Sequence, residues 1–408
     1  MAFTKLTINS LPLSGHTVLL RADFNVPLTD KGRIADDYRI RSSLPTIKKL
    51  LADGCKVVII SHLGRPDGKK DPAFTLEPAA ERLASLLGQP VRFVDECVGP
   101  KVKMAIKRAP KKSVIVLENL RFHAEEEAND AGFAKQLAAD SGADYFVQDG
   151  FGVVHRAHAS TAAITQYLPS VAGLLLEREV DTITQAMKHP EKPLVAILGG
   201  AKVSDKIKVI EALEHSADTI IIGGAMANTL LAYGGHPVGK SKVEQGQDEI
   251  IKDIYTGAAR KAGEGRVDDY LVLPTDLGIG RSVSPHATRT EASIDHIPAD
   301  GLALDIGPAS VKRMHDIIAD AKTVIWNGPL GLFEIPAFAT GSNALAAQLA
   351  DASHITTIIG GGDTAEFAIH WERAHKKSLG HISTGGGASL ELMSGLTLPG
   401  VESLLDAR

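Results

Sequence analysis

The stretch Thr17-Val-Leu-Leu-Arg-Ala-Asp-Phe-Asn-Val-Pro27 contains the unit that decides the fold, a short apolar strand that runs directly into polar side chains. This unit recurs along the chain, with a helical pattern between most of the strands. One such helix is predicted at 44–52, where Ser42 or Ser43 can cap the start, Pro45 falls in the first turn and Gly54 follows the end. Strands of buried length that alternate with helices are typical of an α/β fold with parallel sheets.

The strand pattern is present twice, in two similar halves. A helix expected near Arg178–Lys188, followed by Pro190 and Pro193, separates them. We therefore predict two doubly wound, Rossmann-like parallel-sheet domains joined by a hinge helix, residues 1–185 and 186–395. Open sheets of this kind bind ligands beyond the carboxyl ends of their strands, which predicts a site on each half. The predicted strands are Thr17–Leu20, Lys56–Ile60, Val91–Val94, Ser113–Leu117 and Asp144–Val147, then Leu194–Leu198, Thr219–Ile222, Tyr270–Leu273, Thr323–Trp326 and His354–Ile359.

Composition excludes several classes of protein. The chain has 408 residues and a formal net charge of -5, which argues against a protein built to coat nucleic acid. Its two cysteines, Cys55 and Cys97, are too far apart for a disulfide framework or a cysteine-built zinc site, and no signal-peptide pattern precedes Arg21. The uncharged stretch Thr219–Gly239 is interrupted by Pro237 and reads as a strand, a loop and a buried helix. We expect a cytoplasmic protein with no membrane or nucleic-acid partner.

Arginines and histidines recur after the strands of the first half. Guanidinium groups bind phosphate and carboxylate in pairs, so several arginines at neighbouring strand ends predict a small, multiply charged anion. The histidines leave metal ligation as an alternative, although no H-E-x-x-H spacing accompanies them. The residues concerned are Arg39, Arg41, His62, Arg65, Arg121, His155, Arg156 and His158, with Asp23 and Asn25 after the first strand.

The second half carries glycine turns at its strand ends, which predict a nucleotide site. Glycine lets the backbone approach a phosphate, and the amides that open the next helix donate hydrogen bonds to it. Gly360–Thr364 fits this role best, since it lies between a strand and a helix and presents Asp363 to a magnesium ion. Lys202 and Lys206 are expected to share one face at a helix start and to reach the phosphates.

A second phosphate-loop pattern, Gly234–Ser241, matches G-x-x-x-x-G-K-[ST] and leaves open a P-loop NTPase that uses Lys240. Its context differs from that of a phosphate loop, because it follows the helical stretch Ala225–Leu231 and includes Pro237. A non-catalytic nucleotide or sugar-phosphate binding protein is the alternative from another class.

Seven motifs in order along the chain resemble the phosphoglycerate kinase family. The resemblance implies a two-domain hinged enzyme of glycolysis that transfers a phosphoryl group reversibly from 1,3-bisphosphoglycerate to MgADP, giving 3-phosphoglycerate and MgATP. The motifs are Arg21-Ala-Asp-Phe-Asn-Val-Pro27, Ser61-His-Leu-Gly-Arg-Pro66, Leu117-Glu-Asn-Leu-Arg-Phe122, His155-Arg-Ala-His-Ala-Ser160, Leu198-Gly-Gly-Ala-Lys-Val-Ser-Asp-Lys206, Trp326-Asn-Gly-Pro-Leu-Gly331 and Gly360-Gly-Gly-Asp-Thr364.

The resemblance also implies site residues. Catalytic roles fall on Arg39, Lys202, Lys206, Gly362 and Gly387. Substrate binding falls on Asp23, Phe24, Asn25, Arg39, His62, Leu63, Gly64, Arg65, Arg121 and Arg156. Nucleotide binding falls on Lys202, Lys206, Glu334, Gly361, Gly362, Asp363 and Thr364, with Asp363 oriented toward Mg²⁺.

The family likeness further implies a monomer whose C-terminal segment, 396–408, returns to the first domain. Four positions depart from the usual family pattern, and we expect them to alter local packing and loop dynamics near the triose site more than the chemistry. They are Gly150, Val153, Val154 and Ala163.

Overall fold

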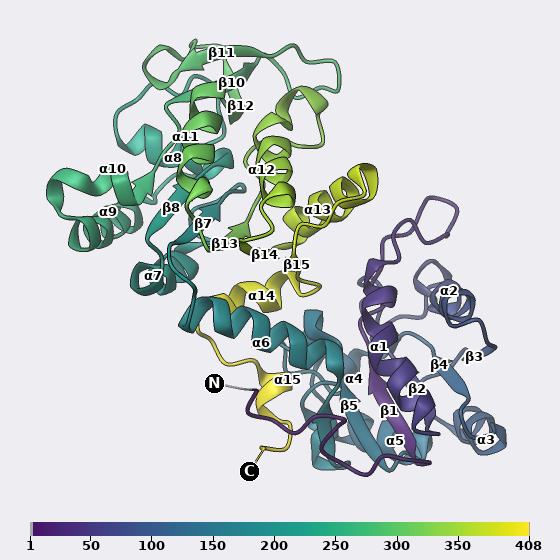
Figure 1. Cartoon of the computed structure of the whole chain (residues 1–408). Coiled ribbons are helices and arrows are strands. Elements are labelled where there is room, and N and C mark those ends of the chain that lie inside the picture. Colours follow the sequence, from purple (N-terminus) through teal and green to yellow (C-terminus); the bar gives the residue numbers. More distant parts are fainter. Residues whose placement is uncertain (1–2, 408) are drawn as a thin grey trace. The chain divides into compact units, whose positions relative to one another are not determined.

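The computed structural model describes residues 3–407, which form two compact units (Figure 1). Unit 1 holds the chain up to Asp181 together with the stretch from Thr397 onward, and unit 2 is Thr182–Leu396. The border between the units falls inside helix α6 (Leu174–Lys188), a few residues before the expected border at 185/186. The helix runs across this border without a break, so no change in secondary structure marks it in the sequence. Met1, Ala2 and Arg408, at the ends of the predicted segments, lie outside the described residues.

Unit 1 is built on six parallel strands in the order β3-β4-β2-β1-β5-β6. Their bounds are β1 Thr17–Arg21, β2 Lys56–Ile60, β3 Val91–Val94, β4 Val114–Leu117, β5 Tyr145–Gln148 and β6 Ser170–Ala172. The helices are α1 Tyr38–Ala52, α2 Glu77–Leu87, α3 Pro100–Arg108, α4 Ala124–Glu127, α5 Ala131–Ser141 and α15 Pro399–Glu402.

Both faces of this sheet are covered, as the apolar runs predict. In β1, Val18 and Leu20 join the core formed with α1 and α2, whereas Leu19 joins the core formed with α3 and α5. Successive side chains of a strand point to opposite faces, so a strand that is apolar at every position must be buried on both.

Unit 2 has a second sheet of six parallel strands, in the order β15-β14-β13-β7-β8-β9. Their bounds are β7 Leu194–Leu198, β8 Thr219–Ile222, β9 Leu271–Val272, β13 Thr323–Asn327, β14 Thr356–Gly360 and β15 His381–Ile382. The helices are α7 Ile207–Ser216, α8 Gly224–Tyr233, α9 Asp248–Ala262, α10 Val267–Tyr270, α11 Pro308–Ala319, α12 Thr340–Asp351, α13 Gly362–His375 and α14 Gly386–Met393. The reading of Thr219–Gly239 as a strand and a buried helix is thereby confirmed.

Unit 2 also contains an antiparallel sheet that the sequence did not predict. Its strands, in the order β11-β10-β12, are β10 Asp276–Gly280, β11 Thr290–Ser293 and β12 Leu302–Ile306. β11 is mostly exposed and β10 contains Gly278 and Gly280, so neither carries a clear apolar pattern. Its own small core includes Leu277, Ile279 and Ala303.

The helix expected at 44–52 was placed wrongly at its start. It begins at Tyr38, so Pro45 lies inside it instead of in its first turn. The hydroxyls of Ser42 and Ser43 donate to the carbonyls one turn earlier, of Tyr38 and Arg39, and cap nothing. Asp36 Oδ1 accepts a hydrogen bond from the Tyr38 amide (2.7 Å), an earlier start signal that the apolar pattern does not reveal.

The C-terminal segment packs within unit 1. The Leu6 amide donates to Leu405 O (2.7 Å), and the ammonium of Lys5 pairs with Asp406 (2.7 Å). The amide of Gly400 donates to Val154 O (2.9 Å), so the last helix lies against the loop that follows β5. No helix among residues 3–407 is long and apolar enough to cross a membrane.

Candidate active site

The chain leaves β1, β2 and β4 at one edge of the sheet of unit 1, because neighbouring strands are parallel. Asp23 follows β1 and pairs with Arg39 at the start of α1, the Nη1 to Oδ2 distance being 3.0 Å. The same Nη1 donates to Asn25 O (3.2 Å). Asp23 is buried, whereas the Arg39 side chain keeps 30% of its surface exposed. One end of this guanidinium is therefore fixed and the remainder can meet a ligand.

The loop after β2 is held in place by asparagines from two other strand ends. Asn119 Oδ1 accepts from the Leu63 amide (3.2 Å) and Asn25 Oδ1 accepts from the Gly64 amide (2.9 Å). Gly64 has a φ of 64°, and a Cβ there would lie 2.3 Å from a ring carbon of Phe74. Only glycine suits this conformation beside that ring.

Arg121 links the loop after β4 to the loop after β2. Its Nη1 donates to Gly64 O (2.7 Å) and its Nη2 pairs with Glu127 (3.0 Å). The side chain of Arg156 donates from Nε to His155 Nε2 (3.2 Å). Arg65 is exposed and makes no hydrogen bond or ion pair with the described residues. Four of the predicted arginines therefore lie on or beside the loops at the carboxyl ends of the unit 1 strands. They are Arg39, Arg65, Arg121 and Arg156.

Three histidines in this cluster stay neutral. Burial, then Arg21 and Arg121, hold the pKa of His62 well below its usual value. Burial, then Arg156, lowers the pKa of His155 to about 4. For His158, burial followed by Arg21 and Arg121 also lowers the pKa to about 4. The positive charge of the site therefore comes from its arginines across the neutral pH range.

These depressed pKa values predict a loss of stability in mild acid. The unfolded chain, with a histidine pKa of about 6.5, takes up protons before the folded chain does, so stability falls as the pH drops from about 6.5 through about 4. Between pH 7 and pH 5, the wild type should lose about 2 kcal/mol more of its unfolding free energy than His158→Gln does.

Urea titrations followed by far-UV circular dichroism measure this difference, since both tryptophans, Trp326 and Trp371, lie in unit 2 and do not report on unit 1. His286→Gln, at an exposed histidine of unit 2, should follow the wild type. Equal losses in His158→Gln and the wild type would show that His158 does not carry the effect.

Two predicted substrate-binding residues are core residues. Phe24 is 0% and Leu63 4% exposed, and both pack in the core that covers one face of the sheet. Their amides are also occupied, since Phe24 N donates to Ser61 Oγ (2.8 Å). Their side chains therefore shape the site from behind and do not line it.

Sequence reasoning missed a buried layer beneath the site. Arg21, Glu126 and Ser160 are all at most 1% exposed and contact one another. Arg21 and Ser160 stood inside recognised motifs, but nothing in the local pattern distinguished a buried arginine from a ligand-binding one.

The positions that depart from the family pattern lie close to this site. A Cβ at Gly150 would approach Asp23 N to 3.3 Å, and Val154 accepts the hydrogen bond from Gly400. Val153 and Ala163 are both 3% exposed, so they act through packing.

In unit 2 the glycine turns meet at the carboxyl ends of β7, β8, β13 and β14. Gly328 has a φ of 105°, and a Cβ there would lie 2.1 Å from Gly199 O. The turn after β13 therefore touches the turn after β7 backbone to backbone. Because glycines carry no side chain, the backbone amides of these turns can come close to a phosphate bound over them.

Lys206 and Lys202 differ in their surroundings. Both lie in the turn before α7, which starts at Ile207, so the prediction that they share a helix face is wrong. Lys206 donates a hydrogen bond from Nζ to Asn327 Oδ1, and burial lowers its pKa to about 8 while Asp205 and Asp363 oppose the shift. Lys202 is exposed.

The start of α13 presents the strongest anion-binding feature of unit 2. Gly361 is its N-cap, with a φ of 92°, and Gly362 and the exposed Asp363 open its first turn. The Thr364 hydroxyl accepts from the Gly328 amide (2.7 Å) and the residue is 1% exposed, so its side chain joins the start of α13 to the turn after β13. Gly387 is the second residue of α14, the position that Asp363 has in α13.

The remaining predicted nucleotide residue, Glu334, is exposed in the loop after β13. The alternative phosphate loop, Gly234–Ser241, follows helix α8 instead of a strand, and the amide of Lys240 donates to Gly301 O (2.8 Å). This segment therefore lacks the strand-loop-helix geometry that a P-loop requires.

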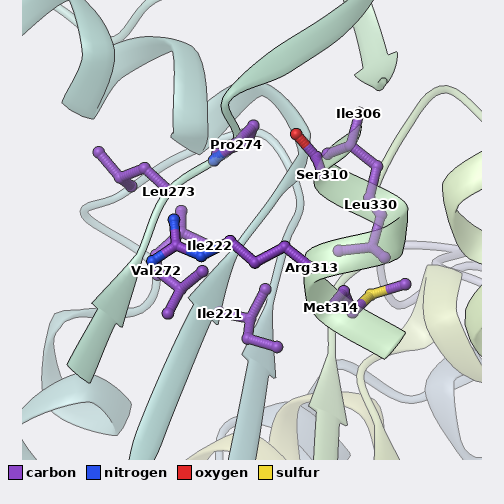
Figure 2. Close-up of a pocket in the computed structure, with 10 residues that line it drawn as sticks. All are labelled: Ile221, Ile222, Val272, Leu273, Pro274, Ile306, Ser310, Arg313, Met314 and Leu330. Atoms are coloured by element: carbon purple, nitrogen blue, oxygen red, sulfur yellow. The ribbon is translucent and has the colours of Figure 1, made fainter. Parts of the chain in front are cut away.

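A separate pocket of unit 2 lies beside β8, β9 and α11 (Figure 2). It encloses about 290 Å³ of empty space, its open mouth included, and eight of its ten lining residues are apolar. Its polar groups are engaged: Ser310 Oγ donates to Asp276 Oδ1 (2.7 Å) and Arg313 Nη2 donates to Asp268 O (2.7 Å). No predicted site residue lines it, and we assign it no ligand. The lining residues are Ile221, Ile222, Val272, Leu273, Pro274, Ile306, Ser310, Arg313, Met314 and Leu330.

Comparison with known proteins gives a consistent result. Residues 8–396 match the family model for phosphoglycerate kinase. Phosphoglycerate kinases of Desulfosudis oleivorans and Moorella thermoacetica are 48% and 47% identical to the chain, over 98% of it and 98% and 99% of their own length. The structure of phosphoglycerate kinase from Coxiella burnetii is similar with a TM-score of 0.83 at 36% identity, and that from Pyrococcus horikoshii with 0.81 at 30%, each covering 98% of both chains.

Proposed function

The chain belongs to the phosphoglycerate kinase family, and from this premise we propose that unit 1 binds the phosphoglycerate and unit 2 the nucleotide. The enzyme is a phosphotransferase that moves a phosphoryl group between 1,3-bisphosphoglycerate and ADP in glycolysis. One contrast supports the assignment of the two units: arginines surround neutral histidines in unit 1, whereas glycine turns and open helix starts surround Lys206 in unit 2.

The arginine cluster suits a substrate with a phosphate at one end and a carboxylate or acyl phosphate at the other. Arg65 and Arg156 provide planar guanidinium donors, which bind such groups with defined geometry. Arg121 is 4% exposed and bonds to Gly64 O and Glu127, so it holds the loop after β2 and adds positive charge behind the site. Asp23 and Asn25 hold Arg39 in place and supply acceptors for substrate hydroxyl groups.

Phosphoryl transfer depends on alignment and on neutralising the charge of the equatorial oxygens. We assign this role to Arg39 from unit 1 and Lys206 from unit 2, assisted by Lys202 and the amides of Gly362 and Gly387. Direct transfer requires these groups to reach the same phosphoryl group, so the cycle includes a hinge motion that brings the units together and excludes water.

The nucleotide is expected to carry Mg²⁺, whose hard oxygen preference fits Asp363. This exposed carboxylate lies in the first turn of α13, close enough to Lys206 to oppose its pKa shift. Mg²⁺ commonly uses one or two carboxylates together with substrate phosphates, and it would offset the charge of those phosphates. Among residues 3–407, no group of three or more His, Cys, Asp and Glu side chains is placed to hold a metal ion.

We also propose a cytoplasmic monomer. Cys55 and Cys97 are buried free thiols, which suits a reducing compartment. Few large apolar side chains are exposed among the described residues, and they are divided between the two units, which favours a monomer. They are Met104, Tyr233, Val283, Leu396 and Leu405.

The function is tested by ADP-dependent formation of ATP from 1,3-bisphosphoglycerate. Wild type and Lys240→Ala should both turn over at similar rates, because Lys240 lies outside the proposed site. Loss of turnover in Lys240→Ala alone would favour a P-loop NTPase, and binding of both ligands without turnover would favour a binding protein. Hydrogen exchange with each ligand tests the units: 3-phosphoglycerate should protect amides of unit 1, and ADP those of unit 2.

A further inference from the structure

Arg21 lies directly beneath the arginine cluster and is 1% exposed. Its Nε donates to Ser160 Oγ (2.8 Å), and its Nη1 donates to Ala22 O and reaches Ser61 Oγ at 3.5 Å. Its Nη2 lies 3.3 Å from Nδ1 of His62. Each nitrogen of the guanidinium therefore contacts the protein itself, and Arg21 is not available to bind an anion.

A buried carboxylate keeps Arg21 in this orientation. Glu126 Oε1 lies 4.0 Å from Nη2 of Arg21 and accepts from the hydroxyl of Ser160 (2.6 Å). The Ser160 amide donates to the other oxygen, Oε2 (3.0 Å). Rotation of the guanidinium would leave buried donors and a buried carboxylate without partners, which is costly.

The contact with Arg21 determines where the proton of His62 lies. A guanidinium nitrogen can only donate a hydrogen bond, so Nδ1 of His62 must accept with its lone pair. A neutral imidazole then carries its single proton on Nε2, which bonds to no described residue. Protonation of Nδ1 would point an N–H at the Arg21 guanidinium, which cannot accept it. Arg39, Arg121 and His158 also lie near the ring and lower the pKa of His62, so they disfavour the imidazolium further.

We propose that Arg21 is a positioning residue that holds His62 as its Nε2–H tautomer, so that His62 donates a hydrogen bond to the anionic substrate. This rests on the proposed function of unit 1 as the phosphoglycerate site. His62 then serves as a directional donor, and neither as a cation nor as a general base, because the atom that could accept a proton is covered by Arg21.

A second histidine of the same cluster provides an internal comparison. Arg156 Nε donates to Nε2 of His155 (3.2 Å), so His155 must carry its proton on Nδ1. That Nδ1 is buried and has no partner among the described residues. Two arginines therefore hold two histidines in opposite tautomers.

Long-range ¹H–¹⁵N correlation spectra of ¹⁵N-histidine-labelled wild type, without ligand at pH 7, test this directly. His62 should show the Nε2–H pattern and His155 the Nδ1–H pattern, with assignments from His62→Gln and His155→Gln. An Nδ1–H tautomer or an imidazolium at His62 would overturn the proposal. The spectra need no substrate, so their outcome is independent of whether the enzyme turns over.

A pair of substitutions tests the use of the Nε2 proton. The amide nitrogen of glutamine can take the place of Nε2, whereas that of asparagine reaches only the place of Nδ1. His62→Gln should raise the KM for 3-phosphoglycerate less than about 10-fold, and His62→Asn by about 10- to 100-fold, with smaller changes in kcat. Equal losses in the two variants would contradict the donor role. A wild type without activity toward 3-phosphoglycerate would instead refute the proposed function.

The role of Arg21 is separated from a general packing role by Arg21→Lys and Ser160→Ala. Lysine keeps a charge beside Glu126 but removes the planar donor to Nδ1, so His62 should become a mixture of tautomers and the KM should rise. Ser160→Ala disturbs the same buried layer and leaves the Nη2 contact, so the tautomer of His62 should stay as in the wild type. The reverse pattern would remove Arg21 from the role. If Arg21→Lys does not fold, the wild-type spectra and the His62 pair still decide the question.

Discussion

Arg39→Ala should lower kcat by about 10³-fold and leave the affinity for ADP nearly unchanged. Arg39 keeps 30% of its surface exposed while Asp23 and Asn25 hold only its Nη1, so the rest of the guanidinium can face a transferring phosphoryl group. An arginine that acts on charge present only in the transition state affects turnover far more than ground-state binding.

Arg39→Lys should not restore turnover, because a single ammonium cannot bridge two oxygens while it remains bound to Asp23. Arg41→Ala is the matched control. Arg41 was predicted with Arg39 as an anion-binding arginine, but it lies further along helix α1 and pairs with Asp37 instead (2.9 Å). Steady-state kinetics in the direction of ATP formation, with ADP binding measured by calorimetry, give both quantities. A loss below tenfold in Arg39→Ala would exclude the proposed role.

Lys206→Ala should lower kcat/KM for ADP by about 10²- to 10³-fold, because a preorganised positive charge would be lost from the phosphate site. Lys208→Ala, at an exposed lysine of α7, should retain activity. Similar losses in both variants would indicate that general charge, and not Lys206 itself, matters.

The pKa of Lys206 adds a pH signature to this prediction. The free enzyme loses the charge of Lys206 as the pH rises through about 8, so kcat/KM should fall above that pH. Lys206→Arg keeps its charge to much higher pH and should shift or remove this alkaline fall in kcat/KM, even if its overall activity is lower. An alkaline fall that persists unchanged in Lys206→Arg would belong to another group.

Much of the site could be predicted because parallel sheets place successive strand ends at one edge. Asp23, His62 and Arg121 follow three different strands, and the structure does bring their loops into contact. The same argument placed the turns after β7 and β13 together in unit 2. The sequence pattern alone could not show that the backbones of Gly199 and Gly328 touch.

Other features depend on burial and on partners far away in the chain. Arg21 resembled the other arginines at strand ends, yet Ser160, 139 residues further on, and Glu126 enclose it. Phe24 and Leu63 stand in ligand-binding motifs but point into the core. The antiparallel sheet of β10, β11 and β12 escaped prediction since β11 is mostly exposed and β10 contains two glycines, so β12 had no recognisable partner strand in the sequence.

The order of apolar strands and helices by itself determined an α/β protein with one polar edge for each parallel sheet, because buried strands must be apolar and strand alternation is local. Only the tertiary structure decided which charged residue at that edge faces solvent and which lies beneath it. The state of a side chain such as Arg21, His62 or Lys206 depends on desolvation and on hydrogen-bond partners, and folding supplies both from remote parts of the sequence.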